Sequence, residues 1–250
     1  MIDPRIAERR RNVLERGARK GVRRALLLLV GVAMVAGLVW LLQSPVLSVN
    51  EIAILGSNRT DVVEAVTAAG LEEGTPLVLV RTEEIIGALE ALPWIRSATA
   101  ERMFPDRVEV RVEERVPVGW IWIGGSYLLV DDGGVVLEEA SRSDPAFPVL
   151  QFPIERLQPG AAYSDQMVLG AIEFAAGGGG GVPGLELWQE GEEMWASVQG
   201  HRIRLGRPVD MAAKAAALNA VLTDGIPAAS LINLIAPSRP AVTPINQPSS

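Results

Sequence analysis

Residues 92–118, which read LPWIRSATAERMFPDRVEVRVEERVPV, decide the fold of this chain. Within them, residues 107–113 alternate strictly between charged side chains and valines, which is typical of a strand with one buried face. Residues 104–106 (Phe-Pro-Asp) predict a turn, and residues 95–103 predict the other strand of a hairpin. Pro117 marks the end of this unit.

Upstream of the hairpin, the sequence predicts one more strand and two helices. Residues 46–55 indicate a strand, and an amphipathic helix capped by Asp61 follows it. A second amphipathic helix starts at Thr82 and ends before Pro93. Residues 46–115 therefore predict a small α+β domain in the order β-α-α-β-β.

Downstream, residues 117–236 predict a second, mostly β domain. The segment Asp131-Asp132-Gly133-Gly134 predicts a hairpin turn rather than a calcium loop, because the alternating ligands of such a loop are missing. A C-terminal helix is expected from Asp210 to Leu222, followed by an edge strand at residues 230–236. The glycine run at residues 177–181 predicts a flexible connector. Residues 237–250 contain four prolines and predict a disordered tail.

The N-terminus predicts a single transmembrane helix at residues 25–44. Residues 25–42 hold no charge, which suits a hydrocarbon core about 30 Å thick. Residues 1–24 carry a net charge of +6, so this tail is expected to stay in the cytoplasm. A cleaved signal peptide is the alternative, but no site of small residues follows the apolar run. We expect a single-pass type II protein in the cell (inner) membrane, contacting the lipid bilayer, with extracytoplasmic C-terminal domains.

Composition offers little for catalysis. The chain has no cysteine, which excludes disulfides and thiolate metal sites, and its one histidine, His201, accompanies no nucleophile motif. Neighbouring acids such as Glu113 and Glu114 point to opposite faces of a strand, so they do not predict a catalytic pair. The basic tail lacks aromatic residues for stacking nucleic acid. We expect no enzyme, metal, cofactor, nucleic acid or small-molecule substrate.

Beyond these patterns, a set of residues matches a known family. The set is Val49, Ile52, Ile54, Gly56-Ser57-Asn58, Leu92-Pro93-Trp94-Ile95, Ala98, Ala100, Arg102, Phe104-Pro105, Val108, Val110, Val112, Glu114-Arg115, Pro117-Val118 and Asp132-Gly133-Gly134. With these residues the chain resembles the bacterial cell-division family FtsQ/DivIB. The spacing of Lys214, Leu218 and Leu222 is similar to a helix of that family's β domain.

The resemblance implies a POTRA domain at residues 46–115, a β domain at residues 117–236 and an essential-type scaffold of the division complex, or divisome, at the septum. It implies no enzymatic activity. Its implied partners are FtsB/DivIC-like and FtsL-like membrane-anchored division proteins, through which the family helps to regulate septal peptidoglycan synthesis. Arg102, Glu114 and Arg115 are either surface charges of the predicted hairpin or part of a contact surface on the POTRA domain.

The resemblance also implies that a partner adds a strand to the terminal strand of the β domain, where unpaired backbone groups would complete a ladder. This sequence departs from the family's pattern at Asn233, Ile235 and Ala236, where an acidic, a basic and an aromatic residue are usual. The predicted partner-binding residues are Ser230, Leu231, Ile232, Asn233, Leu234, Ile235 and Ala236.

Two other functions remain open from the sequence. One is a POTRA-bearing translocation or assembly factor, which would require a transmembrane barrel in the chain or beside it. The other is an anchored cell-wall hydrolase, since carboxylates are plentiful.

Overall fold

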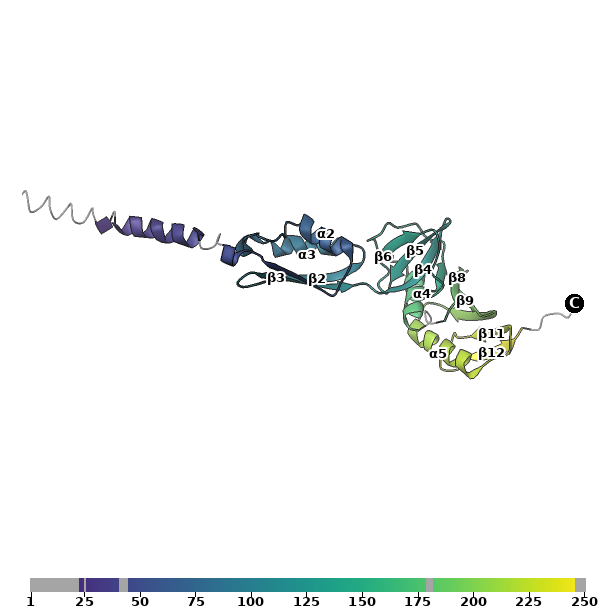
Figure 1. Cartoon of the computed structure of the whole chain (residues 1–250). Helices are drawn as coiled ribbons and strands as arrows, with labels where there is room; N and C mark the ends of the chain where they lie inside the picture. The colour runs from purple at the N-terminus through teal and green to yellow at the C-terminus, as the bar shows by residue number, and fades with distance from the viewer. Residues whose placement is uncertain (1–22, 25, 41–44, 179–181, 246–250) are drawn as a thin grey trace, which may run out of the picture.

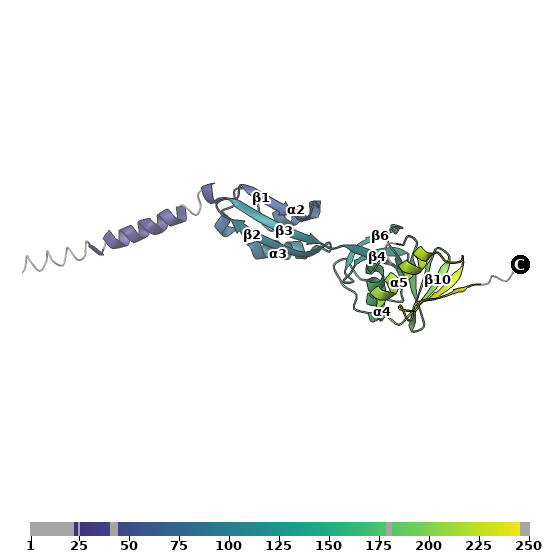
Figure 2. The same cartoon turned by 90° about the horizontal axis from the view of Figure 1, so that it is seen from below.

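The computed structural model describes residues 23–24, 26–40, 45–178 and 182–245. Its described parts follow one another along an elongated molecule: an N-terminal helical segment, a three-stranded sheet and a nine-stranded sheet (Figure 1). The last described residues, 241–245, lie at the end far from the N-terminal helix in both views (Figures 1 and 2). The two sheets lie in the two domains that the sequence predicts, and the first is called the POTRA domain below after the family that it resembles.

The three-stranded sheet has the order β1-β3-β2, with β1 parallel and β2 antiparallel to the central β3. Gly56 ends β1 with φ of +91°, and a Cβ there would lie 2.0 Å from the carbonyl oxygen of Val112, so only glycine fits this turn. The two helices cover one face of the sheet, and short 3₁₀ turns lie at Pro45–Leu47 and Leu77–Leu79. The elements are β1 (Glu51–Leu55), α2 (Thr60–Ala68), α3 (Thr82–Glu90), β2 (Ile95–Met103) and β3 (Arg107–Glu114).

The core of this domain follows the predicted periodicity. The alternating valines of β3 are buried, and they pack against apolar residues one helical turn apart on α2 and α3. The predicted side-chain cap at Asp61 is wrong. The helix already begins at Thr60, where Asp61 lies in its first turn and pairs with Arg59.

The second sheet has the order β12-β11-β10-β9-β8-β7-β4-β5-β6. It mixes antiparallel hairpins with parallel pairs at β4–β7, β7–β8 and β10–β11. The strands are β4 (Pro117–Ile123), β5 (Ser126–Asp131), β6 (Val136–Ala140), β7 (Val149–Gln151), β8 (Glu186–Glu190), β9 (Glu193–Val198), β10 (His201–Gly206), β11 (Ser230–Asn233) and β12 (Ala241–Pro244).

Two helices, α4 (Gln166–Ala176) and α5 (Met211–Asp224), pack on one face of this sheet. Phe174 and Leu218 from the helices and Ile203 from β10 belong to one fully buried cluster. On the opposite face, a smaller cluster of Trp120, Leu129 and Leu137 covers only the β4–β6 half. The open face of β8–β10 therefore remains exposed to solvent.

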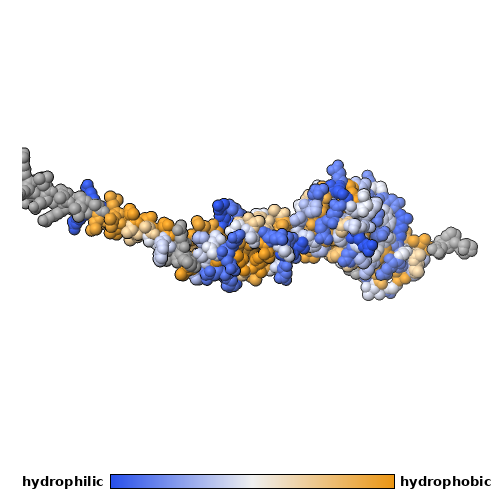
Figure 3. Space-filling model, turned by 45° about the horizontal axis from the view of Figure 1, so that its top comes forward, coloured by the Kyte–Doolittle hydropathy of each residue, from blue (hydrophilic) through white to orange (hydrophobic). Residues whose placement is uncertain are grey.

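Residues 26–40 form a helix whose apolar side chains are exposed, from 46% at Val39 to 74% at Trp40. These side chains make the hydrophobic band at one end of the molecule in Figure 3. Within the ranges that the structure describes, no helix combines the length and the apolar character that crossing a membrane requires. Residues 25 and 41–44 of the predicted span lie outside those ranges, as do residues 1–22 of the predicted cytoplasmic tail and residues 179–181 of the predicted glycine connector.

The prediction of a disordered tail from residue 237 is wrong for Ala241–Pro244, which form β12. A turn reverses the chain after β11, with the N–H of Arg239 donating to the carbonyl oxygen of Ala236 at 3.0 Å. The strand was missed because it is short, contains proline and buries none of its side chains, so no apolar alternation indicates it. Residues 246–250 of the predicted tail lie outside the described residues.

Candidate functional site

The predicted terminal strand β11 is not the edge of the sheet. It lies between β10, to which it is parallel, and β12, to which it is antiparallel. In the second pairing Leu231 lies opposite Thr243 and Asn233 lies opposite Ala241. The side of β11 predicted to be free for a partner is paired with β12, a strand of the same chain.

Backbone groups of β11 alternate between its two neighbours. Toward β10, the N–H of Ser230 donates to Nδ1 of His201 at 3.2 Å, and the N–H of Leu234 donates to the carbonyl oxygen of Arg204 at 2.9 Å. On the other side, the carbonyl oxygen of Ala229 accepts from the N–H of Ile245 at 2.8 Å. Because hydrogen-bonded pairs alternate along an antiparallel ladder, Leu231 and Asn233 turn their backbone groups toward β12.

Side chains of β11 separate into two sets. Ile232 and Leu234 point into the main core and Ser230 is buried, with its hydroxyl donating to the carbonyl oxygen of Pro227 at 2.6 Å. Leu231 and Asn233 are half-buried. The seven predicted binding residues therefore include three that hold the domain together; the last two, Ile235 and Ala236, are exposed beyond the strand's end.

Asn233 also ends the ladder. Its side-chain oxygen accepts the N–H of Ile235 at 3.1 Å, which would otherwise point to the edge. A strand on this edge thus has the backbone of Ala229, Leu231 and Asn233 available, a stretch of five residues. Asn233, which stands where the resemblance leads us to expect an acidic residue, therefore has a local structural role.

Beside this edge, the open face of β8–β10 carries a ladder of indoles and guanidinium groups. The guanidinium of Arg202 lies 4.5 Å from the Trp195 ring centre and 5.9 Å from that of Trp188. Arg204 holds Glu193 through two hydrogen bonds of 2.7 and 2.8 Å, which lower the pKa of Glu193 and raise the pKa of Arg204. Sequence reasoning missed this ladder, although EMWASV and HRIRLG both alternate.

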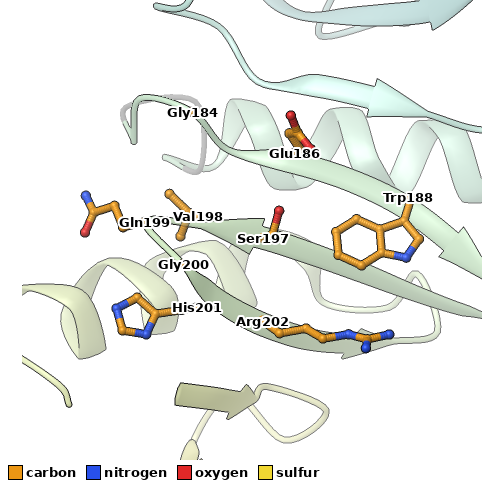
Figure 4. A pocket seen from close by; sticks show the side chains of 9 residues that line it. All are labelled: Gly184, Glu186, Trp188, Ser197, Val198, Gln199, Gly200, His201 and Arg202. Carbon is orange, nitrogen blue, oxygen red and sulfur yellow. The ribbon is translucent and has the colours of Figure 1, made fainter. Parts of the chain in front are cut away.

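Figure 4 shows a shallow hollow at one end of that ladder, between Glu186 and Arg202. Its walls include Trp188 and Ser197 from neighbouring strands, whereas the His201 ring turns away toward β11. Among the residues that the structure describes, no three histidine, aspartate or glutamate side chains come together as a metal site. The hollow is a feature of an open sheet face, without a nucleophile paired to a base.

The three candidate residues on the POTRA domain do not form one surface. Arg102 is exposed and lies opposite Val108, near the turn of the β2–β3 hairpin. Glu114 and Arg115 lie at the other end of β3, about 20 Å away along the strand. Arg115 points to the second domain, so it belongs to the junction rather than to a free contact face.

That junction is built around Asp131 of β5, whose side chain is 0% exposed. One carboxylate oxygen accepts from Arg115 at 2.9 Å and lies 3.6 Å from Arg96; the other accepts the N–H groups of Gly133 and Val135. Asp132 adds an ion pair to Arg96. The predicted hairpin turn is therefore present, and it joins the two domains, which local sequence could not indicate.

Trp94 completes the junction from the POTRA side. Its carbonyl oxygen accepts the N–H of Arg115 at 2.8 Å, and its ring packs against the small cluster around Trp120. The guanidinium of Arg59 stacks on the same ring at 4.6 Å. The Leu92-Pro93-Trp94-Ile95 segment thus has a physical role, since it fixes one domain on the other.

Comparisons with known proteins agree with this architecture. Residues 47–115 match the family model "POTRA domain, FtsQ-type". The cell division protein FtsQ of Streptomyces collinus is 29% identical over 235 residues, which cover 87% of each chain. FtsQ of Streptomyces bingchenggensis is 33% identical over 54% of this chain and 52% of its own length. FtsQ of Anaeromyxobacter sp. (strain K) is 36% identical over 41% of this chain.

The matched region spans nearly the whole Streptomyces collinus protein, but only about a third to a half of the other two. The domain match coincides with the three-stranded sheet and its helices, and the Streptomyces collinus alignment covers enough of the chain to extend into the nine-stranded sheet. The chain is therefore similar to the FtsQ cell-division proteins: residues 47–115 match the FtsQ-type POTRA domain, and a mostly β domain follows.

Proposed function

We propose that this protein is a cell-division scaffold that captures a membrane-anchored division protein by strand addition at β11. The observation that carries the proposal is the backbone of Leu231 and Asn233, which faces away from the body of the sheet and meets only a short exposed strand. The kinship with proteins named FtsQ supports a role in division. We assign the capture to an FtsB/DivIC-like protein, with an FtsL-like protein in the same complex.

Anchoring is the second element of the proposal. Residues 25–42 contain no charge, and residues 26–40 are helical with exposed apolar side chains. We assign residues 25–44 to a single membrane crossing, with the basic residues 1–24 in the cytoplasm. Both sheets then lie outside, and tethering raises the effective concentration of weak strand contacts with other anchored proteins.

The junction supports a scaffold rather than two independent modules. The buried Asp131 holds Arg96 and Arg115 of the POTRA domain, so a protein bound at β11 is held in a defined position relative to the POTRA domain. We propose that the POTRA domain makes additional contacts near the membrane and that the complex regulates septal peptidoglycan synthesis. No catalytic role is assigned to either domain.

A proline at position 231 tests strand addition in the full-length chain. Leu231→Pro removes an N–H that faces the edge and should reduce co-purification of the FtsB/DivIC-like protein about tenfold. Leu231→Thr is the matched control, because it changes the side chain and keeps the N–H. Unchanged co-purification of the proline variant, with an unchanged melting temperature, would rule out strand addition at β11.

A fluorescent fusion tests the role in division. The full-length chain should concentrate at the septum during constriction, and a diffuse membrane signal at all stages would contradict the proposal. Purified protein incubated with peptidoglycan tests the hydrolase alternative, since release of soluble fragments would replace the scaffold assignment.

A further inference from the structure

We propose that β12 is an exchangeable placeholder: Ala241–Pro244 occupy the edge of β11, and an incoming strand binds by displacing them. This inference rests on the proposed strand addition and assigns its regulation to the protein's own tail. Four observations support it, which concern the outer edge of β12, its side chains, its length and its connection to β11.

The outer edge of β12 is a poor site for a further strand. Ala241 and Thr243 turn their backbone groups toward β11, so Val242 and Pro244 turn theirs to solvent. Pro244 has no N–H, and Pro240 stands directly before the strand. Val242 therefore supplies the single outward N–H of β12, and prolines of this kind protect edge strands against pairing.

The side chains of β12 attach it only weakly. All four residues are exposed, including Val242, which lies opposite the buried Ile232 and is 37% exposed as a whole residue. No side-chain hydrogen bond or ion pair is recorded for Ala241–Pro244, all of which the structure describes. Its attachment is a backbone ladder, and any other extended segment can supply the same hydrogen bonds.

The length and connection of β12 also suit exchange. Four residues give few ladder bonds, and the segment is joined to β11 by residues 234–240, so it can detach without disturbing the core strands. Detachment exposes the edge of Ala229, Leu231 and Asn233. A binding protein then meets only the fraction of molecules in which β12 is open, and its apparent affinity is reduced by that fraction.

Two neighbouring proline substitutions distinguish exchange from pairing on the outside. Thr243→Pro removes an N–H that faces β11 and should tighten binding of the co-purifying division protein about fivefold, the equivalent of one net hydrogen bond. Val242→Pro removes the outward N–H and should leave binding unchanged. Loss of binding in Val242→Pro would show that the added strand pairs on the outside of β12, which overturns the inference.

A reversible lock provides the decisive measurement. The chain contains no cysteine, and Leu231 and Thr243 form a hydrogen-bonded pair, in which Cα atoms lie about 5.5 Å apart and suit a disulfide. The full-length double variant Leu231→Cys with Thr243→Cys should lose binding at least tenfold on oxidation. Reduction of the same sample should restore it, which provides a control of identical sequence.

The outcomes separate the two proposals. Equal binding by the oxidised and reduced forms, together with loss of binding in Leu231→Pro, would overturn the placeholder and leave strand binding at this end of the sheet. Binding that is insensitive to the lock and to Leu231→Pro would overturn strand addition itself.

Hydrogen exchange provides a test without a binding protein. The amides of Leu231 and Asn233 should exchange at least tenfold faster than those of Ile232 and Leu234, which face β10. The oxidised lock should slow the first pair and leave the second unchanged. Equal exchange rates of the two pairs in the unmodified protein would contradict an exchangeable β12.

Discussion

The junction at Asp131 and the edge at β12 are both contacts between segments far apart in the chain, yet they are built differently. At the junction, one buried carboxylate satisfies two arginines and two backbone N–H groups. At the edge, backbone hydrogen bonds join β11 to β12, a strand whose own side chains are exposed. The first contact depends on particular side chains, and the second can form with almost any extended segment.

This difference explains which contact suits exchange. Removing the Asp131 carboxylate would leave Arg115 and the N–H groups of Gly133 and Val135 without their acceptor in a largely buried site, so this contact favours a single arrangement. A ladder strand leaves behind N–H and C=O groups that water or another strand can satisfy. The protein therefore has a fixed joint near its middle and a replaceable strand at its end.

The largest expected effect concerns the joint. Asp131→Ala should lower the free energy of unfolding by about 4 kcal/mol, because Arg115 and two turn N–H groups lose their acceptor. Chemical denaturation measures this change. Asp132→Ala is the control, since its exposed ion pair to Arg96 should contribute about 1 kcal/mol at most. Equal losses in the two variants would remove the distinction between buried and exposed acids at the joint.

A second comparison lies within the β11–β12 ladder. Ile232→Ala should cost about 3 kcal/mol, because the side chain is fully buried in the main core. Val242→Ala, on the strand opposite, should cost about 0.5 kcal/mol or less. Thermal and urea unfolding of both variants test the pair. A large loss in Val242→Ala would mean that β12 belongs to the core and is not a replaceable cover.

A single backbone hydrogen bond between β11 and β12 should contribute less to the free energy of unfolding than the buried Ile232 side chain. Thr243→Pro removes one hydrogen bond at an exposed strand and should lower stability by about 1 kcal/mol. Val242→Pro removes an N–H that faces solvent and should therefore change stability by less than half as much. Similar losses would indicate that proline acts through backbone strain rather than through the bond that it removes.

The smallest effect belongs to Lys214 on α5, a buried amine whose Nζ donates to the carbonyl oxygen of Arg207 at 2.8 Å. Burial lowers the pKa of Lys214 below its usual 10.5, although Asp210 opposes this. The unfolded chain therefore binds the proton more tightly, and stability should rise with pH until the usual pKa is passed.

Unfolding measured from about pH 8 to about pH 10.5 tests this pH dependence. Over that interval the protein should gain a few tenths of a kcal/mol relative to Lys214→Met, which lacks the titrating group. The lost hydrogen bond to Arg207 adds a constant offset that does not change the slope. Parallel curves for the two proteins would show that the amine stays charged in the folded state.

Local patterns predicted the three-stranded sheet well, because the alternating valines of β3 and the helix ending at Pro93 are signals within short windows. The sheet-edge hypothesis correctly predicted a strand at β11 but missed β12, which pairs with its edge. Alternation and burial carry no signal for a four-residue strand with exposed side chains, such as Ala241–Pro244. Asp131 was identified as a turn residue, but its arginines lie 16 and 35 positions away in the sequence.

The strand β3 runs along the long axis of the molecule (Figure 2), so the POTRA domain also separates the two ends of the molecule by a fixed length. Its eight residues extend about 27 Å, a distance that an α-helix covers in about 18 residues. The helix of residues 26–40 lies at one end of this domain and β11 lies beyond the other, so the length of the domain sets the distance between them. Under the anchoring proposed above, a partner in the same bilayer needs a stalk at least this long to reach the edge at β11, so stalk length would select among anchored partners.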